Sequence, residues 1–451
     1  MTKMNIAEKL DQSAFSKTHF FILLICTLCM IIDGFDVQAI SFVAPTLIAE
    51  WGVDKQAFGS VFGAGLLGMA IGALTLAPLA DKYGRKPILI ISMIILSASM
   101  AATVFAENIQ YLRIVRFVAG FSLGAIVPNA VALAGEFSPA KIRVTSMMII
   151  SSGFILGGVL GGAFASYLIP YFGWHIVFII GAIAPLIMVF VMWAALPESL
   201  LFLTVKQVKL HSINHWLKKL KIESSSQTDE FPYHTNSINI AKAGIKQLFG
   251  NGLAFGTVLL WVILFMNLLA TFFLANWLPI LISQSGYDAQ HAVWAGATFW
   301  FGGLLGNLVL GRYIDKYGFG ITLVLTFFGG IIFISAIGFS IHIKLLVFTF
   351  IALTGFCILG AQTALNALAA VYYPTEYRST GAGWALGIGR LGSIFGPVIG
   401  GVLISMGLPI TSLFFIFAVP ILIAAIAIFM FWKMDKLPTK ASAPVISDQS
   451  A

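Results

Sequence analysis

Long apolar segments alternate with short polar ones along almost the whole chain. Each apolar segment has about 20 residues or more, which is the length that a helix rising about 1.5 Å per residue needs to cross a bilayer core of about 30 Å. The pattern therefore predicts an all-α integral membrane protein with twelve spanning helices. Their expected limits are 18–46, 56–80, 87–106, 109–135, 144–170, 174–196, 250–283, 291–314, 319–341, 344–371, 379–404 and 408–432.

One polar stretch, at about 197–249, is much longer than the others and separates six helices from six. Its composition favours a flexible linker, with a short amphipathic helix near 213–220. The chain is therefore expected to divide into five parts: an N-terminal segment 1–17, a six-helix half 18–196, the linker 197–249, a second six-helix half 250–432, and a tail 433–451.

The two halves repeat each other. The run Asp81-Lys82-Tyr83-Gly84 returns as Asp315-Lys316-Tyr317-Gly318, 234 residues later. Parallel repeats of six helices are typical of transporters that rock around a central cavity, with a binding site near the membrane midplane. Further matches, at an offset of 235 residues, are Pro139 with Pro374, Arg143 with Arg378, Gly157 with Gly392 and Gly161 with Gly396.

Composition and charge support a membrane protein with a defined orientation. The chain is 59% hydrophobic and only 10% charged, whereas about a quarter of a soluble chain is charged. If the N-terminus is cytoplasmic, 21 of the 26 Lys and Arg residues fall on the cytoplasmic side. The positive-inside rule therefore predicts that both termini are cytoplasmic.

Two carboxylates, Asp33 and Asp36, lie inside the first apolar segment. At a spacing of three residues they share one helix face. A carboxylate at this depth persists mainly where it faces a bundle interior or a wet cavity. From the helix rise, Arg116 in the fourth helix should lie at a similar depth. Two interpretations stay open: these three residues couple transport to protons, or an Asp–Arg pair only ties the first and fourth helices together.

Arg390 lies near the middle of the eleventh helix and needs an anionic partner. A substrate carboxylate would supply one through a bidentate fork; the alternatives are a side chain from the first or fourth helix, or carbonyls freed near Pro397. Polar and aromatic residues on helices expected to face the cavity are further candidates for substrate binding, although hydrogen bonds between helices explain each of them equally well. They are Gln38, Asn129, Asn267, Asn276, Trp277, Gln362 and Asn366.

Charged residues gather where helices are expected to end on the cytoplasmic side. Ion pairs between the two halves at this level would hold an outward-facing state and break on opening inward. The alternative is that these charges are simply solvated at the level of the lipid headgroups. The candidate gating residues are Asp81, Arg85, Glu136, Arg143, Asp315 and Arg378.

The run from Ala77 to Lys86 resembles the signature loop of the major facilitator superfamily, with Ala77 where that motif opens with glycine. Arg116 and the glycines that follow it, up to Gly124, are similar to the family's fourth-helix pattern. Within the superfamily, three motifs resemble the aromatic acid:proton symporters: Asp33-Gly34-Phe35-Asp36-Val37-Gln38, Pro128-Asn129 and Gly389-Arg390-Leu391-Gly392. The resemblance implies a monomeric transporter in a bacterial inner membrane that imports a benzoate-like or related acid with protons.

Other functions are weaker alternatives. A proton-coupled exporter of drugs or metabolites would use the same fold, and the Gly-rich segment 153–162 is compatible with one, but it lacks the proline expected of the exporter signature. A sensor would need an output domain larger than the linker or the tail. An enzyme would need a nucleophile–base pair or a metal cluster, and His211 with His215 in the linker is a weak zinc candidate. We expect no cofactor, no metal and no nucleic-acid partner, only an organic acid, protons and lipid.

Overall fold

The computed structural model describes residues 10–11, 13–205, 216, 219, 245–250, 252–374 and 378–434, nearly all of them helical. Within these residues, twelve helices are long and apolar enough to cross a membrane. The predicted number of spans is therefore confirmed. The chain forms two compact units, Met1–Asn239 and Ile240–Ala451.

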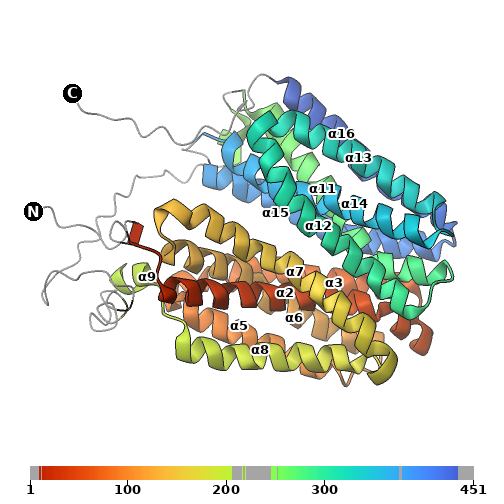
Figure 1. The fold of residues 1–451 in the computed structure, drawn as a ribbon, viewed down its shortest axis with the longest axis horizontal. Helices are drawn as coiled ribbons and strands as arrows, with labels where there is room; N and C mark the ends of the chain where they lie inside the picture. The colour runs from red at the N-terminus through yellow and green to blue at the C-terminus, as the bar shows by residue number, and fades with distance from the viewer. Residues whose placement is uncertain are drawn as a thin grey trace, which may run out of the picture. The chain divides into compact units, whose positions relative to one another are not determined.

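The N-terminal unit is a bundle in which helices distant in sequence pack in pairs. Helix α2 packs along α7, and α3 packs along α6 (Figure 1), while α5 contacts both α6 and α8. The elements are α2 (Lys17–Trp51), α3 (Lys55–Thr75), α4 (Leu79–Tyr83), α5 (Arg85–Thr103), α6 (Ile109–Phe137), the short η1 (Ala140–Ile142), α7 (Arg143–Phe172), α8 (His175–Ala195) and α9 (Leu200–Val205).

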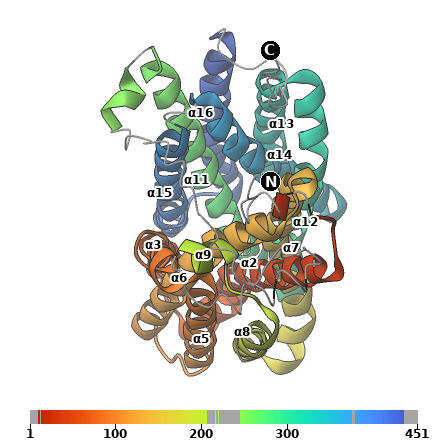
Figure 2. The ribbon, with the colours of Figure 1, turned by 90° about the vertical axis from the view of Figure 1, so that its left-hand side faces the viewer.

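The C-terminal unit repeats this arrangement. Helix α11 packs along α15 and α12 along α14, while α13 packs on α16; α11 and α15 lie side by side in Figures 1 and 2. The elements are η2 (Ile245–Phe249), α11 (Ala254–Gln284), α12 (Ala289–Tyr317), α13 (Phe319–Phe339), α14 (Lys344–Tyr372), α15 (Arg378–Ser405) and α16 (Ile410–Lys433).

Close helix contacts at glycine show that the sequence repeat is also a structural repeat. A Cβ added to Gly157 on α7 would lie 2.1 Å from the carbonyl oxygen of Ile31 on α2. A Cβ on Gly392 of α15 would lie 2.1 Å from the carbonyl oxygen of Phe265 on α11. Each glycine therefore allows the same pair of backbones in its unit to touch.

The second span differs from the prediction of one helix over 56–80. Helix α3 ends at Thr75, a turn follows, and the chain resumes as the short α4 at Leu79. Pro78 lies in that turn and has no backbone N–H with which to continue a helical ladder. The break leaves Asp81 on a separate short helix, directly before Gly84, which has a φ of 102°.

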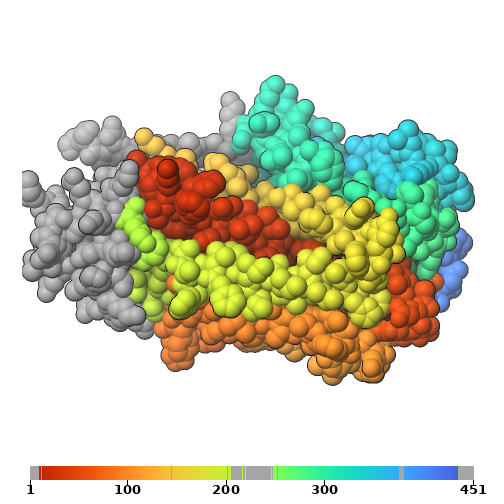
Figure 3. All heavy atoms as spheres, turned by 60° about the horizontal axis from the view of Figure 1, so that its bottom comes forward, coloured from red at the N-terminus to blue at the C-terminus, as the bar shows by residue number. Residues whose placement is uncertain are grey.

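The outer surface of the N-terminal unit is apolar along α8, which runs across the face seen in Figure 3. Large hydrophobic side chains are exposed there, among them Ile183, Ile187, Phe190 and Trp193, as expected of a helix that faces lipid. The amphipathic helix expected near 213–220 lies outside the described residues except at Trp216 and Lys219, and so does the tail beyond Met434.

Candidate functional site

An ion pair between Asp36 on α2 and Arg116 on α6 is buried in the N-terminal unit. The guanidinium donates from Nη1 to Oδ1 at 3.0 Å and from Nη2 to Oδ2 at 2.9 Å. A third bond runs from Nη2 to the backbone carbonyl of Asp36 at 3.0 Å. The side chains of Arg116 and Asp36 are only 3% and 1% exposed. The pairing expected from helix depth is therefore present in the structure, in bidentate form, and it ties α2 to α6.

Asp33 lies one turn before Asp36 on the same helix and is fully buried. Gly34 between them lets α2 approach α7 so closely that an added Cβ would lie 1.9 Å from the carbonyl oxygen of Phe154. The two aspartates thus belong to a segment whose position is set by backbone contact. Proton coupling by these two aspartates stays a prediction.

Two further candidates of this unit are buried. Gln38 on α2 is fully buried, and within the described residues neither atom of its amide has a hydrogen-bond partner. Asn129 on α6 donates from Nδ2 to the carbonyl of Ala125, one turn earlier in its own helix, at 2.8 Å. Substrate binding by either residue stays a prediction.

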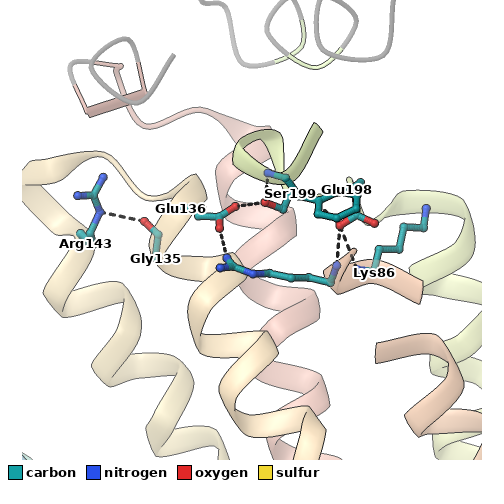
Figure 4. Close-up of polar contacts among 8 residues, drawn as sticks. Lys86, Gly135, Glu136, Arg143, Glu198 and Ser199 are labelled. Atoms are coloured by element: carbon teal, nitrogen blue, oxygen red, sulfur yellow. Dashed lines mark hydrogen bonds and ion pairs between the residues drawn. The ribbon is translucent and has the colours of Figure 1, made fainter. Parts of the chain in front are cut away.

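At the end of the bundle that carries α4, five residues form a polar cluster, which we call the Glu198 cluster (Figure 4). Arg85 forms an ion pair with Glu136 at the end of α6. Ser199 donates its hydroxyl to the other carboxylate oxygen of Glu136 at 2.6 Å. Glu198 accepts the backbone N–H groups of Arg85 at 2.8 Å and Lys86 at 3.2 Å. The chain leaving α8 is therefore fastened to the first turn of α5 and to the end of α6.

Sequence reasoning missed Glu198 and Ser199, although Pro197-Glu198-Ser199 directly after the sixth span was a visible polar signal. Glu198 caps α5 although it lies 113 residues further along the chain. Its negative charge also interacts favourably with the positive N-terminal end of the helix dipole. Gly84 makes room for it, because a Cβ at Gly84 would lie 2.4 Å from Glu198 Oε2.

Replacing Glu198 with alanine should lower the thermal stability of the purified protein by about 1–3 kcal/mol, because two N–H groups at the start of α5 lose a charged acceptor. Glu198→Gln keeps an acceptor oxygen and should retain part of the stability. Thermal unfolding in detergent measures both effects. Glu107→Ala removes an exposed glutamate that precedes α6 and is the matched control. Equal unfolding midpoints for Glu198→Ala and Glu107→Ala would contradict a stabilising role for this cluster.

The remaining gating candidates lie at or near the ends of helices. Arg143 forms an ion pair with Asp11 of the N-terminal segment and donates to the carbonyl of Gly135 at 2.9 Å, and Glu136 is paired with Arg85. Asp81 on α4 and Asp315 on α12 are exposed. Arg378 begins α15, and its side chain lies outside the described residues. A gating role for these residues stays a prediction.

In the C-terminal unit, Arg390 lies on α15 and is half-buried. Trp277 on α11 is fully buried and donates its indole N–H to the carbonyl of Pro397 on α15 at 2.9 Å, which is the hydrogen bond between helices that was the alternative for this residue. Asn276 donates to the carbonyl of Phe272 in its own helix at 2.7 Å.

The other three candidates of this unit form one row across two helices. Asn267 on α11 donates from Nδ2 to Oε1 of Gln362 on α14 at 2.8 Å. Gln362 donates from Nε2 to Oδ1 of Asn366 at 2.9 Å. Gln362 and Asn366 therefore share one face of α14, and Asn267 joins them from α11.

Known proteins with similar sequences and structures agree with this fold. The sequence matches the Major Facilitator Superfamily over residues 26–385 and 260–448. It is 38% identical to the gallate transporter of Pseudomonas putida, over 94% of both chains. It is 36% identical to a 4-hydroxybenzoate transporter of Acinetobacter baylyi, over 93% of both chains.

Among solved structures, the xylose transporter XylE from E. coli matches with a TM-score of 0.70 at 18% identity, over 94% of this chain and 97% of that one. A bacterial homologue of the human lysosomal transporter Spinster matches with a TM-score of 0.71 at 16% identity, over 93% and 98% of the two chains. At these identities the likeness shows the fold alone. Together with the twelve apolar helices, the sequence relatives make this chain a multi-pass bacterial membrane protein and a transporter rather than an enzyme. The chain belongs to the major facilitator superfamily and, within it, to the aromatic acid:proton symporter family.

Proposed function

We propose that this protein imports an aromatic carboxylic acid together with protons by alternating access. The observation that carries the proposal is the buried, bidentate ion pair of Asp36 with Arg116, one helical turn from the buried Asp33. The relatives named for gallate, 4-hydroxybenzoate and benzoate support an aromatic acid as the substrate. We also propose a monomer in the bacterial inner membrane with both termini in the cytoplasm, which the distribution of Lys and Arg supports.

The charges of this site suit reversible protonation. With both carboxylates ionised, Asp33, Asp36 and Arg116 carry a formal charge of −1 together, so one proton makes the group neutral. A net charge is costly in a buried, low-dielectric environment, while the guanidinium holds one carboxylate in a fixed bidentate geometry. The group can therefore take up a proton when it opens to the outer side and release it when it opens to the inner side.

The substrate carboxylate is assigned to Arg390. This residue lies 12 positions into α15, about 18 Å from the start of that helix, which is near the middle of a core of about 30 Å. Its planar fork matches a carboxylate with two parallel hydrogen bonds. Gln38, Asn129 and Asn276 are the further proposed contacts, and the proposed gate is made of the charged residues at the cytoplasmic end.

The membrane potential explains why protons are needed. Moving an anion into a negatively charged cell is opposed by about 2.3 kcal/mol per charge for each 100 mV. One proton carried with each monoanion makes the step electroneutral, and a second makes it driven by the potential. The direction and size of the change in uptake with membrane potential therefore report the number of protons carried with each anion.

Uptake into proteoliposomes tests the proposal. The panel contains labelled benzoate, hydroxybenzoates, gallate, phenylpropionates and muconate, each with and without an inward proton gradient. We expect the gradient to drive accumulation of at least one aromatic acid, and Asp36→Asn and Arg390→Ala to abolish it. Accumulation that ignores the gradient would refute proton coupling. If no acid accumulates and the gradient instead drives the extrusion of amphipathic dyes, the protein is an exporter on the same fold.

A further inference from the structure

The row of three carboxamides in the C-terminal unit runs from a buried residue to an exposed one. Asn267 on α11 is fully buried, Gln362 on α14 is half-buried, and Asn366 one turn later is exposed. The two hydrogen bonds that join them are 2.8 and 2.9 Å long. The donor–acceptor direction that is set at the buried end therefore fixes which group, a donor or an acceptor, is left at the exposed end.

A backbone carbonyl sets the direction of these hydrogen bonds. Asn267 Nδ2 lies 3.4 Å from the carbonyl oxygen of Ile358 and 2.8 Å from Gln362 Oε1. A carbonyl only accepts, so this end of the Asn267 amide has to be the NH2 group. Gln362 must then turn its oxygen toward Asn267 and its NH2 toward Asn366. The Asn366 oxygen is occupied by this bond, and its NH2 group stays at the open end of the row.

This arrangement costs free energy in a pair of membrane-spanning helices. The oxygen of Asn267 is buried without a hydrogen-bond partner in the described residues, and such an atom costs about 1–3 kcal/mol. Asn366 lies six residues before the end of α14, about 9 Å along the helix. An exposed amide at that depth is tolerated where it lines a wet cavity rather than lipid. Apolar residues would pack here at a lower cost, which indicates a function for the row.

We propose that this row makes Asn366 a hydrogen-bond donor that selects aromatic acids carrying an acceptor oxygen on the ring, with Asn267 and Gln362 as positioning residues. The inference rests on the proposed import of an aromatic acid, in which Arg390 binds the carboxylate. It adds the residue that distinguishes one substituted ring from another, and it states that this residue donates the hydrogen bond rather than accepting it. A hydroxyl or methoxy oxygen satisfies the amide, whereas a ring hydrogen or a methyl group leaves it without a partner.

Pairs of ligands with nearly equal shape test whether Asn366 donates a hydrogen bond to the ring substituent. At the ring substituent, methoxybenzoates accept a hydrogen bond but cannot donate one, and ethylbenzoates, in which a CH2 group replaces the oxygen, do neither. The 3- and 4-substituted pairs are compared as competitors of uptake and, by calorimetry, as ligands of the detergent-solubilised protein. We expect the wild-type protein to bind the methoxy member about three- to tenfold more tightly at one of the two positions, which corresponds to the net value of one hydrogen bond.

Variants then assign the preference to the row. Asn366→Leu should bring the methoxy-to-ethyl ratio of binding constants to about one, and Asn366→Gln should restore part of it. Asn267→Leu should also lower the ratio, although residue 267 does not contact the ligand, because Gln362 then loses the hydrogen bond that orients its amide. Thr349→Val is the matched control, since Thr349 is an exposed residue of α14 whose hydroxyl donates to the carbonyl of Leu345 in its own helix; the ratio should not change.

Three results would overturn the proposal: a wild-type ratio near one at both positions, tighter binding of the ethyl compounds, or a ratio that survives Asn366→Leu. The calorimetric arm keeps the test valid for variants that bind but do not transport. Failure of import itself is distinguishable, because a protein that accumulates benzoate yet shows no methoxy preference keeps its proposed function and loses only this inference.

Discussion

Arg116→Met should destabilise the protein by about 3–5 kcal/mol and abolish uptake, because it leaves the Asp36 carboxylate buried without its guanidinium. Both side chains are almost fully buried, at 3% and 1% exposure, so water cannot take over the lost hydrogen bonds. The measurements are thermal unfolding in detergent and uptake in proteoliposomes. Arg113→Met is the matched control: Arg113 lies on the same helix one turn earlier and is exposed, so its loss should change stability by less than about 1 kcal/mol.

The double variant Asp36→Leu with Arg116→Met separates the two interpretations of the pair. A buried ion pair replaced by apolar groups of similar size often folds as well as the original, since both desolvation costs disappear together. We therefore expect the double variant to recover most of the stability and none of the proton-driven uptake. Recovery of uptake as well would show that the pair only ties α2 to α6. A double variant no more stable than Arg116→Met would contradict the direct contact.

The pair could be predicted because depth in a spanning helix follows from residue number. Asp36 and Arg116 lie 80 positions apart, yet each helix has a fixed rise per residue, so counting from the helix ends brings both to one level. The same reasoning gives the twelve spans, since length and hydropathy alone define them. The break at Pro78 was missed because the apolar pattern continues across the turn that ends α3.

Contacts that depend on rotation about the helix axis could not be predicted in this way. Glu136 and Arg143 were both placed at helix ends on the cytoplasmic side, with no partner assigned to either; in the structure Arg85 pairs with Glu136, and Asp11 pairs with Arg143. Depth does not tell which way a side chain points. The contact of Asn267 with Gln362, 95 residues later, likewise needs the packing of α11 against α14.

Gly34→Ala should reduce uptake at least about tenfold and lower stability by about 1–3 kcal/mol or more. The new Cβ would lie 1.9 Å from the oxygen and 2.7 Å from the carbon of the Phe154 carbonyl, whereas nonbonded carbon atoms rest about 3.5–4.0 Å apart. These are backbone atoms that no rotamer change can move, so α2 and α7 have to separate. The shift displaces the segment that holds Asp33 and Asp36, and misplacement by about 1 Å is enough to cost a functional site much of its rate.

Gly387→Ala on α15 is the matched control, because among the described residues no atom beyond its own helix turn lies within 4 Å of the Cβ it adds. A helix-interior alanine is favoured over glycine by about 1 kcal/mol, so this variant should be as stable as the parent or more so. The comparison also separates two roles of Gly34. If Gly34→Ala lowers the unfolding midpoint but leaves the uptake rate per folded molecule unchanged, the close contact of α2 with α7 serves the scaffold alone. If both fall together, the position of the two aspartates depends on that contact, and the glycine belongs to the transport site as a positioning residue.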